Sequence, residues 1–234
     1  EVLRPGGTLV VADGVPAPAV AVAVDVAKAR RGRLVRAAAE PDDDVPTPGA
    51  PGYQRHNLAT AIAAVDAYLG DSVARDADAE RDVAARIAVP GRFETVDGGE
   101  DRPTVIHDGA HNAAGAEALA DALAVAAPAR PVVLVVGVLD DKDPAEMLAA
   151  LEPWCDTFVA VAPRNPRAIP ADRLAEIARE AYPGRDVRIA SDAHDAVDQA
   201  RIAAGTSGTV VATGSLHLVA DLHRGRGAAP GATF

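Results

Sequence analysis

The sequence has few of the residues that build covalent cross-links or aromatic cores. Among 234 residues there are one cysteine, one methionine and one tryptophan, and aromatic residues make up only 3%. The single cysteine, Cys155, excludes an internal disulfide and a zinc site built from cysteines, which fits a reducing cytoplasm. Because 49% of the residues are nevertheless hydrophobic, a buried core must be built from Ala, Val, Leu and Ile.

Basic residues are outnumbered, with 23 Lys and Arg against 34 Asp and Glu, a net charge of −11. This field repels nucleic acids and anionic membranes, so neither is expected as a partner, although a local basic pocket can still take a small anion. No apolar run approaches the roughly 20 residues that span a bilayer. The most hydrophobic stretch, "PAVAVAVDVAKAR", is interrupted by Asp25 and lacks the layout of a signal peptide. We therefore expect a cytoplasmic protein.

The chain begins at Glu1, and its only methionine is Met147. We therefore expect it to be a piece of a longer protein.

Short β-rich runs alternate with alanine-rich helical stretches. In the first part, "TLVVADGV" and "RLVRAA" predict strands, residues 17–31 predict a helix, and "YQRHNLATAIAAVDAYLG" predicts a helix ended by Gly70. A charged segment then leads to Pro90-Gly91, the best candidate for a domain boundary. We place the two domains at residues 1–88 and 89–234.

The alternation is regular after that boundary. Six runs predict strands: "RFETV", "TVIH", "PVVLVVGV", "TFVAVA", "DVRIA" and "GTVVATG". Helices are expected to begin near Ala113, Pro144, Pro170, Asp192 and Ser215. Apolar strands without polar alternation are typical of a parallel sheet covered on both faces. The pattern predicts an α/β fold, a Rossmann-like doubly wound domain with a mainly parallel six-stranded sheet.

One junction concentrates polar residues. The stretch "TVIHDGAHNAAGAEALADAL" runs from a strand through His107, Asp108, His111 and Asn112 directly into a helix. An ordinary turn explains it if Asn112 caps the helix and Gly109 permits a tight bend. A metal site at both histidines is less favoured, because one ends the strand and the other follows the turn. The third interpretation is recognition of an anion or nucleotide at the positive end of the helix.

The surrounding motifs favour the third interpretation. In order along the chain stand "PGRFE" at 90–94, "DGAHN" at 108–112, "GVLDDKD" at 137–143, "RNPRA" at 164–168 and "TGSLHLVADL" at 213–222. Together they resemble the C-terminal domain of the folylpolyglutamate synthase / dihydrofolate synthase branch of the Mur ligase superfamily. Upstream, "GYQRHNLATAIAA" is similar to a helix that closes the family's central ATP-binding domain. Residues 1–88 would then be an incomplete remnant of that central domain.

This resemblance implies an enzyme, an ATP-dependent ligase that joins L-glutamate to a folate or dihydropteroate carboxylate through an acyl phosphate. Its implied cofactors are ATP and Mg²⁺, and its implied partners are these small molecules; the complete enzyme is expected to be a monomer. By resemblance, Asn57, Arg92 and Asp108 contact ATP, and His111 and Ser215 hold the incoming glutamate. Arg92, Asp108 and His111 are the expected catalytic residues.

Simpler interpretations exist for several of these residues. Asn57 and Ser215 are each explained by a helix cap, and Arg92 by a surface ion pair. The run Asp140–Asp143 is either a solvated face or a support for the site.

The sequence also departs from the family. No G-x-x-x-x-G-K-[ST] loop is present, so the phosphate cradle and its magnesium-holding hydroxyl are missing. No metal ligand is therefore expected in this chain, and alone it should not transfer phosphate from ATP.

Three other functions stay open. A Mur-type cell-wall peptide ligase would share fold and reaction, and a non-catalytic binding domain would share the fold alone. A methyltransferase fragment is suggested by "VLRPGGTLVVAD", which nothing downstream supports.

Overall fold

The computed structural model describes residues 3–42, 45, 52–70, 73, 76–99 and 101–225. It divides into two compact units, Glu1–Ile87 and Ala88–Phe234. The two units are described separately below.

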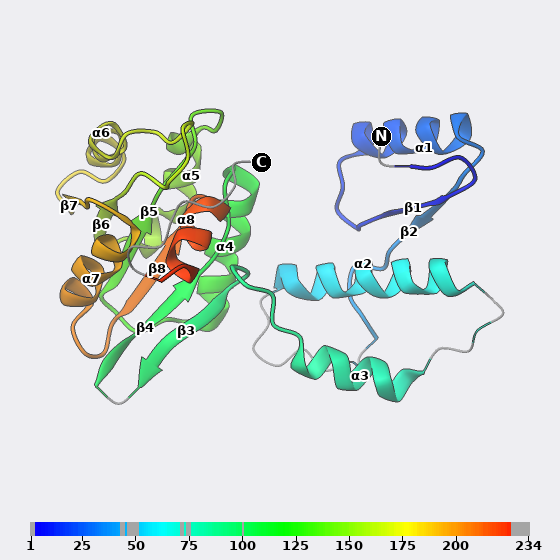
Figure 1. Cartoon of the computed structure of the whole chain (residues 1–234), viewed down its shortest axis with the longest axis horizontal. Helices are drawn as coiled ribbons and strands as arrows, with labels where there is room; N and C mark the ends of the chain where they lie inside the picture. The colour runs from blue at the N-terminus through cyan, green and yellow to red at the C-terminus, as the bar shows by residue number, and fades with distance from the viewer. Residues whose placement is uncertain are drawn as a thin grey trace. The chain divides into compact units, whose positions relative to one another are not determined.

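The described residues of the first unit form a two-stranded parallel sheet and three helices. Its elements are β1 (Thr8–Val11), α1 (Ala17–Ala29), β2 (Arg33–Arg36), α2 (Gly52–Leu69) and α3 (Ala77–Arg86). Helices α1 and α2 both contact the two strands, and Figure 1 shows them on either side of the strand pair. Few of its side chains are buried; the exposed large apolar ones include Val22, Val65, Tyr68, Val83 and Ile87.

The second unit is built on a six-stranded sheet of order β3-β4-β8-β5-β6-β7 (Figure 1). The strands are β3 (Glu94–Gly99), β4 (Arg102–His107), β5 (Val132–Val136), β6 (Thr157–Ala160), β7 (Asp186–Ile189) and β8 (Thr209–Thr213). Only the β3–β4 pair is antiparallel; all other neighbours are parallel. The expected fold class is confirmed.

Helices cover both faces of this sheet. They are α4 (Ala113–Ala126), α5 (Pro144–Leu151), η1 (Glu152–Trp154), α6 (Ala171–Ala181), α7 (Ala193–Ala204) and α8 (Leu216–His223). Alternate residues of β5 divide between two cores: Leu134 packs in the core under α4, α5 and α6, and Val133 in the core under α7 and α8. Both are fully buried. Because each face of the strand is apolar, β5 reads as a continuous hydrophobic run.

Local capping explains where the helices of this unit begin. Asn112, Asp143, Asp192 and Ser215 each accept backbone N–H bonds from the first turn of the helix they precede. These are residue types that favour the N-cap because their short side chains satisfy otherwise unpaired donors. The helix starts expected from the sequence agree with these caps. By contrast, α3 was not foreseen within the charged segment.

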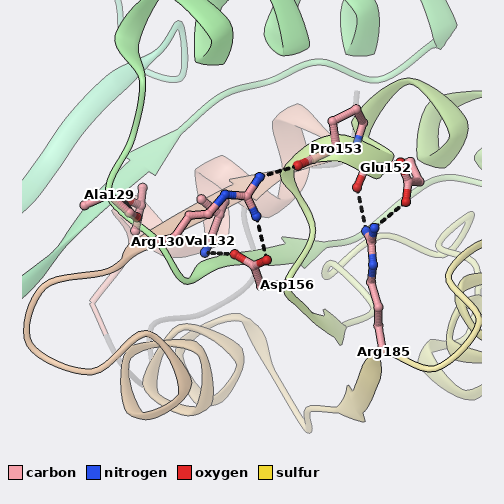
Figure 2. Close-up of polar contacts among 8 residues, drawn as sticks. Ala129, Arg130, Val132, Glu152, Pro153, Asp156 and Arg185 are labelled. Carbon is pink, nitrogen blue, oxygen red and sulfur yellow. Dashed lines mark hydrogen bonds and ion pairs between the residues drawn. The ribbon is translucent and has the colours of Figure 1, made fainter.

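A set of polar contacts secures the amino ends of β5 and β6, opposite the edge that carries the candidate site. Asp156 accepts from the backbone N–H of Val132 and from Arg130 Nη1, both at 2.6 Å. Arg130 also donates to the Pro153 carbonyl, and Arg185 reaches Glu152 in the same way (Figure 2). These contacts tie strand ends to η1, which is a stabilising role rather than a catalytic one.

Candidate nucleotide- and glutamate-binding site

Three loops meet at the carboxyl edge of β4 and β8. These strands are parallel neighbours, and His107 pairs with Ala212 at their ends. The antiparallel strand β3 begins at the same edge, because Glu94 pairs with His107. From this edge α4 leaves towards one face of the sheet and α8 towards the other. Ligands of open α/β sheets bind beyond the carboxyl ends of the strands, where successive connections diverge to opposite faces.

Hydrogen bonds fasten the three loops to one another. The backbone N–H of Gly109 donates to the Gly91 carbonyl at 2.8 Å, and that of Gly214 donates to the Ala110 carbonyl at 2.9 Å. The loop before β3 is thereby joined to the loop after β4, which is joined to the loop after β8. Residues distant in the sequence thus form one rigid surface.

Asp108 anchors two of these loops. Its side chain is buried, with Oδ1 accepting from the Ala110 N–H and Oδ2 from the Phe93 N–H, each at 2.8 Å. Phe93 has a φ of 51°, a left-handed conformation that non-glycine residues rarely adopt. Strain of this kind persists where surrounding contacts fix the backbone, and the Asp108 carboxylate is such a contact.

Arg92 lies against Gly109. A Cβ atom at Gly109 would approach Arg92 Nη1 to 2.7 Å and Leu216 Cδ2 to 2.3 Å. Gly109 is not among the glycines with positive φ, so close packing, not a tight bend, requires a glycine here. The partly buried Arg92 donates through Nη1 to the Gly91 carbonyl at 3.3 Å. Its guanidinium group therefore stands directly over the turn that follows β4.

His111 and Asn112 lie at the start of α4. His111 Nδ1 is 2.8 Å from the Gly109 carbonyl. A carbonyl only accepts, so Nδ1 carries a proton and donates it to this bond. Asn112 caps the helix by accepting from the Gly115 N–H at 2.8 Å. The ordinary capping interpretation of Asn112 is therefore confirmed.

Ser215 is buried and caps α8, its Oγ accepting from the His217 N–H at 3.0 Å. The helix-cap interpretation of Ser215 is thus confirmed, and this does not exclude a ligand at the same helix end. The preceding Gly214 has a φ of 101°, and a Cβ there would come within 2.8 Å of the Gly137 carbonyl. The backbones of Gly214 and Gly137 therefore lie close together, and the residue that follows β5 reaches the edge of the site.

Asn57 belongs to the first unit. It is exposed on α2, where Nδ2 donates to Gln54 Oε1 at 3.2 Å. Because it lies inside the helix, its interpretation as a helix cap is wrong. Arg92, Asp108, His111 and Ser215 are brought together in the second unit; Asn57 is not part of that unit.

The loop Asp140–Asp143 follows β5. Asp143 caps α5, accepting from the Ala145 and Glu146 N–H groups. Asp141 pairs with Lys142 at 2.9 Å and with Arg167 at 3.6 Å. The hydrogen bond from Lys142 lowers the pKa of the Asp141 carboxyl, with the nearby cationic charges as smaller causes. The loop is therefore an exposed charged turn beside the candidate site.

Sequence reasoning missed one group of side chains next to the site. Glu94, His107 and His223 each offer a ligand atom, and these atoms lie within 4.8 Å of one another. Glu94 stood inside a recognised motif, but nothing in the sequence linked it to a histidine 129 positions later.

Comparison with known proteins identifies the class. Residues 91–216 match the model of the family "Mur ligase, glutamate ligase domain", and the chain belongs to this family.

Within the family, the similar proteins are folate enzymes. The dihydrofolate synthase/folylpolyglutamate synthase of Mycobacterium tuberculosis is 42% identical over 150 residues, covering 63% of this chain and 30% of that protein. A solved folylpolyglutamate synthase of M. tuberculosis, complexed with ADP and AMPPCP, superimposes with a TM-score of 0.80 at 30% identity, covering 96% of this chain and 56% of that one. The bifunctional folylpolyglutamate synthase/dihydrofolate synthase of Yersinia pestis, complexed with AMPPNP and Mn, superimposes with a TM-score of 0.73 at 29% identity. The match covers 94% of this chain and 54% of that one. The chain thus spans about a third to a half of the length of these proteins.

No helix in the described part of the chain is long and apolar enough to cross a membrane.

Proposed function

We propose that the complete protein joins L-glutamate to the carboxylate of a folate or of dihydropteroate, using ATP. The observation that carries this proposal is the joined set of three loops at the edge of β4 and β8, which presents Arg92, Asp108, His111 and Ser215. Membership in the glutamate ligase family and the similarity to folate enzymes support it. Residues 1–88 would be part of a central ATP-binding domain, and residues 89–234 the glutamate ligase domain.

The reaction proceeds in two steps. A carboxylate oxygen of the folate attacks the γ-phosphorus of ATP, so that ADP leaves and an acyl phosphate forms. The amino nitrogen of glutamate, after losing a proton, attacks the acyl carbon, and inorganic phosphate leaves from the tetrahedral intermediate. Bound ATP with Mg²⁺ supplies the phosphoryl group, and the protein supplies orientation and cationic charge.

Arg92 and Asp108 serve the nucleotide in this proposal. Arg92 brings a fixed positive charge to the loop edge, where it stabilises negative charge on the transferring phosphoryl group. Asp108 acts mainly by holding the Arg92–Phe93 turn, since both of its oxygens accept backbone N–H bonds. From the first unit, Asn57 would contact the adenine. This chain offers no phosphate loop, so the main phosphate and magnesium contacts are assigned to none of its residues.

His111 and Ser215 serve glutamate. Because the Gly109 carbonyl binds the Nδ1–H of His111, the other ring nitrogen, Nε2, is the one that faces a ligand in this proposal. Nε2 accepts from the amino group of glutamate, while the N-termini of α4 and α8 supply positive potential for its carboxylates. Ser215 orients the start of α8 by its cap.

The test is steady-state kinetics of the complete gene product with ATP and glutamate varied in turn. His111→Ala removes one hydrogen bond, about 1–3 kcal/mol, and should weaken the use of glutamate roughly tenfold to a hundredfold while changing that of ATP much less. Asp108→Asn, which keeps one acceptor oxygen, should weaken ATP more than glutamate. Asp192→Ala removes a helix cap elsewhere in the unit and serves as the stability control. If His111→Ala weakened ATP and spared glutamate, the assigned roles would be reversed.

We also propose that the 234-residue chain alone performs no ligation, because it contains no phosphate loop. ADP release coupled to folate glutamylation by the purified chain would contradict this. A Mur-type cell-wall peptide ligase is the alternative substrate class; turnover with a nucleotide-linked peptide instead of a folate would favour it. We expect the complete enzyme to be monomeric and cytoplasmic.

A further inference from the structure

Two histidines and a glutamate converge beside the candidate site, on the side of the sheet that α7 and α8 cover. Glu94 begins β3, His107 ends β4 and His223 ends α8. His223 Nε2 lies 2.9 Å from Glu94 Oε2, and the His107 and His223 rings meet edge to face with centroids 5.5 Å apart. One ligand atom from each residue lies within 4.8 Å of the other two.

His107 has an unusual environment for a polar group. Its side chain is 6% exposed, and Nδ1 is buried without a hydrogen-bond partner in the described part of the chain. A buried polar atom left unpaired is costly, and such atoms in native proteins often mark an ion or ligand. Burial, followed by the neighbouring His223, lowers the pKa of His107 to about 4. The ring is therefore neutral near pH 7, the form in which imidazole binds a metal.

The structure assigns a binding site for a divalent transition metal of the zinc class to Glu94, His107 and His223. Two imidazoles and a carboxylate are a ligand set that suits zinc, whereas magnesium prefers oxygen ligands throughout. Bonds of about 2.0–2.2 Å in a tetrahedral site place ligand atoms roughly 3.3–3.5 Å apart. The 2.9 Å contact and the 4.8 Å limit bracket this separation. Metal binding requires small changes in these separations. The His223 side chain makes them, because it is the most exposed of the three ligands.

The site has a supporting contact and an approach path. Glu94 Oε2 accepts from the Gly91 N–H at 2.8 Å, which orients the carboxylate. His107 and His223 also line a cavity of about 390 Å³, together with His194, Asp198 and Arg201. This cavity gives an ion a route to both histidines.

The bound metal has a structural role. It joins α8, the last described helix, to the β3–β4 hairpin, whose edge carries Arg92 and Asp108. This site differs in kind from a Mg²⁺ site for ATP, because Mg²⁺ prefers oxygen ligands and two of the three ligands here are imidazoles. It also differs from the pair His107 and His111 considered from the sequence, because the cluster contains His223 and Glu94 and not His111.

The experiment titrates the metal-free 234-residue chain with Zn²⁺ in the presence of millimolar Mg²⁺, followed by calorimetry, and with Co²⁺, followed by visible absorption. We expect one ion per chain, an absorption spectrum typical of tetrahedral Co²⁺, and a higher melting temperature with Zn²⁺. His223→Asn and Glu94→Gln should each weaken binding at least about tenfold, since even loss of a group that only orients a ligand costs tenfold to a hundredfold. Both side chains are partly exposed, so folding should be retained.

Two matched controls separate this site from surface histidines. His194 lines the same cavity but bonds to the Arg224 carbonyl, and His56 forms an exposed pair with Glu40. His194→Ala and His56→Ala should each leave the affinity within about twofold. The proposal is overturned if no stoichiometric ion binds, if Mg²⁺ competes effectively, or if the control variants weaken binding as much as His223→Asn.

Discussion

The two units contain parallel strands of similar composition in opposite surroundings. Strand β1 reads "TLVV" and β8 reads "TVVAT", yet every residue of β8 is buried while only Val11 of β1 is. In the second unit each central strand has neighbours on both sides and helices over both faces. In the first unit, two strands and their helices leave Val22, Val65 and Ile87 largely exposed.

The difference shows that burial depends on the number of layers and neighbours rather than on strand composition. Parallel strands are normally covered on both faces, and a two-stranded sheet is marginal by itself. The second unit meets this requirement with six strands and two cores. We therefore expect the second unit to account for most of the cooperative unfolding free energy.

The largest expected effect concerns Cys155. It is 2% exposed, and burial raises the pKa of its thiol from 9.0 to about 12, more than offsetting the opposing contribution of Arg185. Since the thiolate is the reactive form, this change alone lowers its fraction at pH 8 by about a thousandfold. Alkylation in native buffer should be slower than in urea by at least that factor.

Cys155 labelling also tests the comparison of the two units. Cys155 and the only tryptophan, Trp154, both lie in the second unit. As urea increases, helical circular dichroism from the first unit should decrease before thiol labelling and Trp154 fluorescence change. If all three signals changed together, the units would form one cooperative structure.

The second prediction compares apolar truncations. Leu134 is fully buried in β5, so Leu134→Ala should lower the free energy of unfolding by about 2–5 kcal/mol. Val22 is 63% exposed on α1, so Val22→Ala should change it by less than about 0.5 kcal/mol. Urea titration measures both effects. Trp154 fluorescence reports the effect of Leu134→Ala, and circular dichroism reports the effect of Val22→Ala. A large loss in Val22→Ala would indicate that the first unit has a closer-packed core than its exposure suggests.

The smallest expected effect compares helix caps. Asp192 accepts from the His194 and Asp195 N–H groups at the start of α7. Asp192→Ala should cost about 1–2 kcal/mol in the main unfolding transition. Asp76 caps the exposed helix α3 through the Ala79 N–H, and Asp76→Ala should cost about 0.5 kcal/mol, visible only in circular dichroism. Equal effects in both variants would contradict the difference between the units.

Much of the second unit was predictable because its determinants are local. Short β-rich runs predicted all six strands, and Asn112, Asp192 and Ser215 marked helix starts through their own side chains. In the first unit, helix α3 was not predicted, because its ten residues are rich in charge and Ala84 is its only buried residue. An apolar face could therefore not identify it.

The candidate site was only partly predictable. The motifs pointed to Arg92, Asp108, His111 and Ser215, and the structure brings these four residues together at one edge of the sheet. The sequence predicted that Gly109 permits a tight bend and that Asp108 contacts ATP, but it did not predict the contacts that these residues make within the protein. Asp108 holds Phe93 in a left-handed conformation, and Gly109 makes room for Arg92 and Leu216.

The sequence by itself determined the fold class, the family and most helix starts of the second unit, because periodicity, capping and each single motif depend on residues close together in the chain. Only the tertiary structure decided that β8 lies between β4 and β5, that three loops share one edge, and that Glu94, His107 and His223 converge. The physical reason is that contacts between distant residues follow from strand order and from which face each helix covers. In the first unit similar strand-forming residues are mostly only partly buried, because burial depends on neighbours that a strand's own sequence does not contain.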